Sequence, residues 1–158
     1  MAGRDLRKSS DIGPRIVFLS VEGTHGSLKE IAVRRVEVVD ERKVRQVLTK
    51  FSKREIGNLM KLLDRYDIVA TWGGSRLDLP LLTAQALKLG VDPSPLHFLT
   101  HVDLEAFVRE KLRILDADLK DVATFLGAGV GRTKADTLAR VFKRLRSFIR
   151  NTKPELAL

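Results

Sequence analysis

The sequence predicts a single α/β domain in which helices flank a mixed five-stranded sheet. Three observations support this fold class. Five short runs are rich in β-branched and aromatic residues, helical patterns separate and follow the later runs, and 158 residues that are 44% hydrophobic suffice for one sizeable core. The order is three meandering strands, then helix, strand, helix and strand, then terminal helices. This order combines an antiparallel three-strand meander with two parallel strands.

The first strand is expected at residues 15–22, RIVFLSVE, because this β-branched and aromatic run follows a proline. Strand periodicity then places Ser20 and Glu22 on the same face of the sheet. The turn GTHGS leads from this strand into the rest of the meander. The remaining strands are expected at residues 31–39, 44–49, 67–72 and 97–104.

The first helix is expected at residues 53–66, where apolar residues recur at helical spacing and Ser52 can serve as the N-cap. The second is expected at residues 78–89 and ends at Gly90, which has no Cβ and can adopt the left-handed cap conformation. Three further helical patterns follow, at residues 104–112, 119–126 and 133–151.

The predicted domain covers residues 15–150, and residues 1–14 and 151–158 are expected to be tails. Every apolar run is interrupted by charge well short of the roughly 20 residues that cross a bilayer. No apolar segment typical of a secretory signal follows the basic N-terminal residues, so a cytoplasmic location without membrane contact is expected. Two Asn and two Gln beside 29 Lys and Arg indicate a thermophilic source.

The charge of the chain favours a polyanionic partner. The formal net charge is +9, and nucleic acid is the first candidate for such a field. The alternative is a basic protein whose charge only maintains solubility. There is no cysteine, so a bound metal would have oxygen or histidine ligands, and a hard ion such as Mg²⁺ or Mn²⁺ is expected.

Two carboxylates are expected at one edge of the sheet. In open α/β sheets, ligands gather beyond the carboxyl ends of the central strands. Glu22 lies at that end of the first strand, and Asp78 follows the fourth strand across the turn Gly73-Gly74. If these strands are parallel neighbours, the two carboxylates converge and can bind a divalent cation. The alternatives are that Asp78 is an ordinary helix N-cap and that Glu22 is a solvated strand end.

Four segments, FLSVEG, ATWGGSRLDLPLL, HVDLEAF and LKDVATFLG, together with the late helix, resemble the exonuclease domains of the DEDD superfamily. The resemblance is strongest to the exonuclease domains of family B DNA polymerases and covers roughly residues 15–149. It implies an RNase H-like fold and a 3′–5′ exonuclease that acts on single-stranded DNA or RNA ends with Mg²⁺ or Mn²⁺. The segment LDLPLL matches the second family motif well, with Leu77 in place of Phe.

The resemblance implies that Glu22, Asp78 and Asp136 are the catalytic residues that hold the metal. The first motif departs from the family, because Ser20 stands where the leading, metal-bridging Asp is expected. A neutral hydroxyl coordinates only feebly in its place. Asp136 also has an alternative role, since TKAD at residues 133–136 resembles a helix capping box. Asp103 is expected to cap a helix.

The last part of the chain is strongly basic. From Arg132 to Lys153 there are eight Lys or Arg and one acid, which favours a surface that follows phosphates. The alternative is the solvated face of an amphipathic helix. Trp72 can either stack on a base or pack beneath the helices. The predicted nucleic-acid contacts are Trp72, Arg76, Arg132, Lys134, Arg140 and Lys143.

Two functions from different classes remain open at this point. One is a DEDD-like exonuclease on single-stranded DNA or RNA. The other is a catalytically inactive module of the same fold that binds nucleic acid or a partner protein in replication or repair. The missing bridging Asp favours the second, and the motif around Asp78 favours the first. A basic protein-interaction module without a nucleic-acid role is the third, weaker reading.

Overall fold

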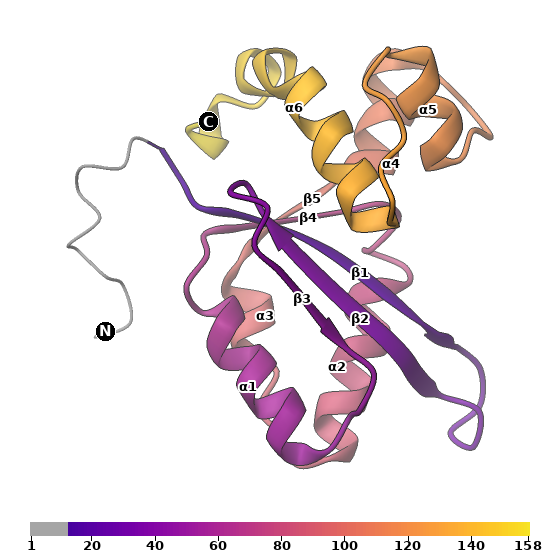
Figure 1. Cartoon of the computed structure of the whole chain (residues 1–158), viewed down its shortest axis with the longest axis vertical. Helices are drawn as coiled ribbons and strands as arrows, with labels where there is room; N and C mark the ends of the chain where they lie inside the picture. Colours follow the sequence, from indigo (N-terminus) through magenta and orange to yellow (C-terminus); the bar gives the residue numbers. More distant parts are fainter. Residues whose placement is uncertain (1–12) are drawn as a thin grey trace.

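The computed structural model describes residues 13–158 and contains the predicted mixed five-stranded sheet (Figure 1). The strand order is β3-β2-β1-β4-β5, with β1 antiparallel to β2, β2 antiparallel to β3, and β1, β4 and β5 mutually parallel. The strands are β1 (Ile16–Thr24), β2 (Ala32–Asp40), β3 (Arg45–Leu48), β4 (Ile68–Thr71) and β5 (Thr100–Asp103). The predicted fold class is confirmed. The N-terminal tail expected at residues 1–14 falls almost entirely outside the described residues.

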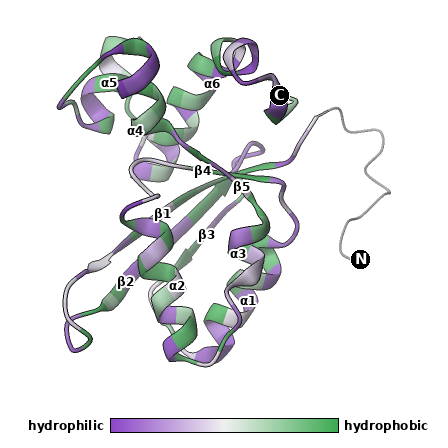
Figure 2. Cartoon of the chain, turned by 180° about the vertical axis from the view of Figure 1, so that it is seen from behind, coloured by the Kyte–Doolittle hydropathy of each residue, from purple (hydrophilic) through white to green (hydrophobic). Residues whose placement is uncertain are grey.

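Helices cover the sheet in two groups. The first group packs on one face and consists of α1 (Lys53–Leu63), α2 (Asp78–Lys88) and α3 (Ser94–Phe98). The second group packs on the opposite face and consists of α4 (Leu104–Phe107), the π-helical turn η2 (Val108–Leu112), α5 (Leu119–Phe125) and α6 (Lys134–Thr152). Figure 2 shows the apolar residues of the helices and strands gathered between these layers. No helix within residues 13–158 has the length and hydropathy of a membrane span.

Strand alternation divides the core into two clusters, one on each face of the sheet. Val17 and Leu19 of β1 face α1 and α2, whereas Ile16 and Phe18 face α6. On the α6 side the rings of Phe18 and Phe142 meet edge to face, with 5.4 Å between their centroids. Burial of these large side chains anchors α6 across the middle of β1.

The caps predicted at Ser52, Thr133 and Gly90 are confirmed. The Ser52 hydroxyl accepts a hydrogen bond from the amide of Glu55 at the start of α1, and the Thr133 hydroxyl accepts one from the amide of Asp136 at the start of α6. Gly90 follows α2 with φ = +73°, the left-handed conformation that a residue without Cβ adopts readily. Local side chains therefore fix where these helices begin and end.

Two parts of the chain differ from the expectation. The strand expected at residues 97–104 is only half as long, because Ser94–Phe98 forms the helix α3 after Pro93 and with Pro95 in its first turn. The tail expected at residues 151–158 continues α6 to Thr152 and then forms the 3₁₀ turn η3 (Pro154–Leu156). Leu156 is only 9% exposed and packs into the α6-side core.

Candidate functional site

The buried carboxylate of Asp78 lies at the carboxyl end of β1. Its Oδ2 atom accepts a hydrogen bond from the backbone amide of Val21, at 3.0 Å, and the residue is 2% exposed. β1 and β4 are parallel neighbours, which is the strand arrangement that the sequence pattern predicted. Asp78 is the first residue of α2 and makes no capping bond there, because the N-cap position belongs to Leu77. The N-cap alternative for Asp78 is therefore wrong, and the acid joins two distant segments instead.

The turn between β4 and α2 is held by side chains that carry Asp78 into this position. Asp103 accepts hydrogen bonds from the amide of Gly73 at 2.8 Å and from the hydroxyl of Ser75 at 2.8 Å. Gly73 has φ = +73°, and a Cβ on Gly74 would lie 2.3 Å from the Thr71 hydroxyl oxygen, so both positions require glycine. Asp103 also caps α4, as expected.

Burial makes Asp78 an unusual acid. Desolvation raises its pKa above the ordinary value, because the charged form loses water. The hydrogen bond from Val21 and the charges of Lys134 and His25 oppose this shift. A buried carboxyl with a raised pKa beside a strand end is typical of functional sites, although ion-pair networks produce the same effect.

Glu22 lies near this site but is exposed and paired with an arginine. Its side chain is 57% exposed, and its Oε2 atom is 3.4 Å from Nη1 of Arg35 on β2. Ser20, on the same face of β1, is buried at 3% exposure. The strand alternation predicted for these two residues holds, but the Glu22 carboxylate already has a cationic neighbour.

Glu37, a fully buried acid on β2, was not among the predicted site residues. It is opposite Ser20 in the β1–β2 register and has 0% exposure. Its Oε1 atom is 3.3 Å from Nη1 of Arg35, and its Oε2 atom is 2.7 Å from Nη1 of Arg45 and 2.9 Å from the Thr133 hydroxyl. The only signal in the sequence was an acid with a valine on each side, Glu37 in the run VRRVEVV.

Asp136 is also paired with an arginine. Its Oδ2 atom accepts a short hydrogen bond from Nη2 of Arg45, and its backbone amide donates to Thr133. The amide bond is the Thr133 half of the predicted capping box, whereas the carboxylate of Asp136 binds Arg45. Hydrogen bonding to Asp136 raises the pKa of the Arg45 guanidinium. Arg45 therefore lies between one carboxylate from the sheet and one from α6.

These contacts form a continuous network, which we call the acid–arginine network. It alternates in sign and runs from β1 through β2 and β3 to α6. Its members are Glu22, Arg35, Glu37, Arg45 and Asp136. Asp78 has no direct contact with it and is bonded to β1 from the α2 side.

A family model matches residues 17–156, and it describes the RNase H superfamily. The chain belongs to the RNase H superfamily. A comparison of the chain with curated protein sequences found no significant match.

Solved structures show the same fold. The family B DNA polymerase of the hyperthermophilic archaeon Pyrobaculum calidifontis superposes with a TM-score of 0.65 at 17% identity, over 86% of this chain and 24% of the polymerase. Exonuclease I of E. coli in complex with a dA16 oligonucleotide superposes with a TM-score of 0.64 at 11% identity, over 90% of this chain and 42% of that one. An ExoI/SSB-Ct complex gives 0.67 at 11% identity. The predicted resemblance to DEDD exonuclease domains is thereby confirmed for the fold.

The donor set of this RNase H-superfamily domain does not fit a divalent metal. Hard cations need several carboxylate oxygens that are free to converge. Glu22 and Asp136 instead contact guanidinium groups, and the hydroxyl of Ser20 is neutral. Within residues 13–158, no three His, Asp or Glu side chains are grouped so as to hold a metal ion. The predicted ligands Glu22, Asp78 and Asp136 are not brought together as one cluster.

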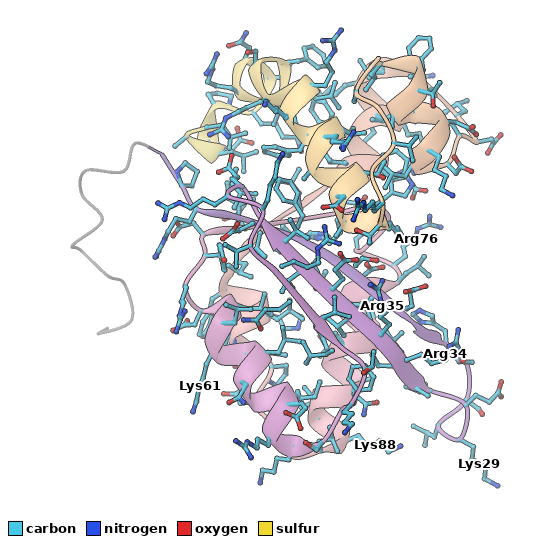
Figure 3. All side chains as sticks on the ribbon, in the orientation of Figure 1. Lys29, Arg34, Arg35, Lys61, Arg76 and Lys88 are labelled. Atoms are coloured by element: carbon cyan, nitrogen blue, oxygen red, sulfur yellow. The ribbon has the colours of Figure 1, made fainter. Side chains whose placement is uncertain are left out.

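The predicted nucleic-acid contacts fall into two classes. Trp72 is 7% exposed and packs in the α6-side core, so the packing alternative for Trp72 holds. Arg76 is exposed, but it pairs with Glu105 at 3.0 Å (Figure 3). The other four are exposed at the start of α6 or along it and form no ion pair within the described chain. They are Arg132, Lys134, Arg140 and Lys143.

Proposed function

We propose that this RNase H-superfamily domain binds single-stranded DNA or RNA and does not cleave it. The observation that carries the proposal is the position of Arg45, between the buried Glu37 and Asp136. A guanidinium with several donors satisfies carboxylates in a fixed geometry and keeps its charge at every physiological pH. A dication at Asp136 would have to displace this partner and leave Glu37 with a poorer one.

The nature of residue 20 points the same way. The family resemblance implies an Asp that bridges two metal ions, and Ser20 supplies a neutral, buried hydroxyl instead. Each carboxylate removed from a hard-cation site lowers its affinity, because such ions select charged oxygen ligands. Metal-dependent cleavage therefore meets two independent obstacles. The bridging charge is missing at residue 20, and Arg35 and Arg45 already neutralise the neighbouring acids.

The nucleic-acid part of the proposal rests on charge. The net charge is +9, and exposed cations at the start of α6 and along it have no acidic partner among residues 13–158. Such side chains bind phosphate oxygens without reading sequence and release counterions when they do so. One of the similar structures, exonuclease I, is named as a complex with an oligonucleotide. We propose that the domain works beside other proteins of replication or repair.

The test combines a binding assay with a cleavage assay. We expect a 5′-labelled single strand to bind with an affinity that falls steeply as salt rises, because every phosphate contact releases counterions. The same strand, incubated with Mg²⁺ or Mn²⁺, should keep its full length. Trimming by the wild type that is abolished in Asp78→Ala would contradict the proposal. Failure to bind at low salt would contradict it independently.

A metal-dependent 3′–5′ exonuclease is the second candidate, and the position of Asp78 favours it. This carboxyl is kept buried at the carboxyl end of β1, where desolvation works against its charge. The variant Ser20→Asp separates the two candidates. A large gain of Mn²⁺-dependent trimming in this variant would show a site that lacks only one charge. No gain would show that the acid–arginine network also prevents metal binding.

A further inference from the structure

The strand β3 is an edge of the sheet in the part of the chain that the structure describes. Among residues 13–158 its only strand neighbour is β2, and the register pairs Val39 with Arg45 and Glu37 with Val47. The amide of Asp40 donates to the carbonyl of Val44 at 3.1 Å, which fixes the phase of the ladder. In an antiparallel ladder, pairs of opposite residues alternate between hydrogen-bonded and non-hydrogen-bonded pairs. Arg45 and Val47 are in the non-hydrogen-bonded pairs, so their backbone N–H and C=O groups point away from β2. They present donors and acceptors to any strand that arrives alongside.

A groove of about 400 Å³ runs beside this edge, between β3 and α1. Its strand side is formed by residues 46–50, and its helix side by Glu55, Asn58 and Leu59. Glu55 and Asn58 or Leu59 are three or four positions apart, so one face of α1 lines the groove. Val44 and Val47 are 59% and 44% exposed next to it. An extended chain laid along β3 would find apolar surface as well as backbone partners.

The segment that contains β3 and the start of α1 is cationic. Residues 40–55 contain six Lys or Arg and three acids. All three acids already have partners: Asp40 accepts from Tyr66, Glu41 from Arg146 and Glu55 from Ser52. Within the described chain, five of the six cations form no ion pair. They are Arg42, Lys43, Lys50, Lys53 and Arg54.

We propose that β3 binds an extended acidic segment of a partner protein as a sixth strand. Backbone pairing along the edge would give affinity, and alternating side chains would give specificity, with apolar residues on the face of Val47 and acids on the other face, beside Lys50 in the groove. A second copy of this chain does not fit, because two cationic edges would repel each other. The proposal does not depend on nucleic-acid binding at α6.

The probe is the peptide Asp-Val-Glu-Val-Asp-Val-Glu with blocked ends, titrated into ¹⁵N-labelled full-length chain up to about 1 mM. Amide shifts should be confined to residues 44–50 and the facing side of α1. Two control peptides separate the effect of alternating side chains from the effect of backbone pairing. One has the same composition with acids and valines in separate blocks, and the other is N-methylated at its valines and cannot pair as a strand.

Both control peptides should bind at least about tenfold more weakly than the probe, because strand pairing needs alternation and free amides. The variant Val47→Pro removes an outward amide that β2 does not use and should weaken binding similarly. Val47→Thr is its matched control and should bind as the wild type does. If Val47→Pro does not fold, the N-methylated peptide tests the same bond without altering the protein.

Three results would overturn the proposal. The first is no saturable shift with the alternating peptide over the whole titration. The second is equal binding of the N-methylated peptide, which would mean that charge alone attracts it. The third is that a single-stranded oligothymidylate, and not the peptide, perturbs the amides of β3 and α1, which would make this edge a nucleic-acid surface.

Discussion

The carboxylate of Asp78 is bonded to the backbone amide of Val21 at 3.0 Å, although 57 residues separate them in the sequence. This bond ties the start of α2 to the carboxyl end of β1. It also satisfies an amide that would otherwise be buried without a partner. The acid in the segment LDLPLL is therefore structural in this chain, whatever further role it has.

Asp78→Asn should stabilise the fold at neutral pH. The amide oxygen can still accept from Val21, and the desolvated charge is gone. Burial raises the pKa of Asp78 above 3.8, so the folded state binds the proton more tightly than the unfolded state. The stabilising contribution of the protonated form is therefore present below pH about 3.8 and is lost as pH rises through the folded pKa. Urea unfolding of wild type and variant should give similar stabilities in acid and diverge toward neutral pH.

Asp78→Ala is the control for this prediction. It removes the charge and the acceptor together, leaves the Val21 amide unsatisfied and should destabilise by about 1–3 kcal/mol. If Asp78→Asn were as unstable as Asp78→Ala at pH 7, the carboxylate charge itself would be stabilising, contrary to our account.

His101 should make the fold sensitive to mild acid. Its Nε2 atom is 2.6 Å from the Thr71 hydroxyl, and burial lowers the pKa of the imidazole below 6.5. The unfolded state therefore binds the proton more readily, and stability present above pH about 6.5 is lost as pH falls toward the folded pKa. His101→Gln should flatten the dependence of the unfolding free energy on pH in this range. The variant for comparison is His97→Gln, at an exposed histidine bonded to Thr83.

Arg45→Met should destabilise the fold more than Glu37→Leu does. Removing Arg45 leaves the fully buried Glu37 with only Arg35 and the Thr133 hydroxyl. Removing Glu37 eliminates the buried charge itself, and the half-buried Arg35 and Arg45 keep Glu22 and Asp136 as partners and can reach water, so no buried charge is left uncompensated. Chemical denaturation of the two single variants and the double variant measures the difference. A larger loss in Glu37→Leu would show that the network as a whole is stabilising.

Manganese should leave the melting temperature of the wild type unchanged. A ligand that binds only the folded state raises the melting temperature, and this domain lacks a set of side chains that fits Mn²⁺. The double variant Ser20→Asp with Arg45→Ala restores one carboxylate and frees Asp136. Its melting temperature should rise with added Mn²⁺ and fall back with a chelator. A clear rise in the wild type would argue for a metal site at Asp78.

The cations of α6 should determine the salt dependence of nucleic-acid binding. Arg140→Glu with Lys143→Glu should lower affinity at least about tenfold at low salt and reduce the slope of log K against log salt by about 1–2. Lys61→Glu with Lys88→Glu makes the same charge change on α1 and α2, far from α6 in Figure 3, and is the matched control. Equal losses in the two pairs would mean that only net charge matters.

The sequence alone determined most of the helices and strands of this protein. Strand composition and helix spacing fix the mixed sheet, and caps such as Ser52, Thr133 and Gly90 could be read directly because each acts within one turn of its own helix. The short helix α3 could not be read, because its apolar residues suit a strand equally well and only its prolines favour a helix start. Local signals fail where two conformations use the same residues.

The tertiary structure decided what surrounds the acids. Glu37 and Arg45 are eight residues apart in the sequence, and Arg45 and Asp136 are 91 residues apart, so no local sequence pattern predicts these contacts. The chemistry of a carboxylate depends on the charges beside it. Strand pairing brings guanidinium groups to Glu22 and Glu37, and the packing of α6 brings Asp136 to Arg45. The positions of the acids along the chain suggested a metal centre. In the folded protein arginine side chains lie beside these acids instead, because the tertiary structure decides which charged side chains become neighbours.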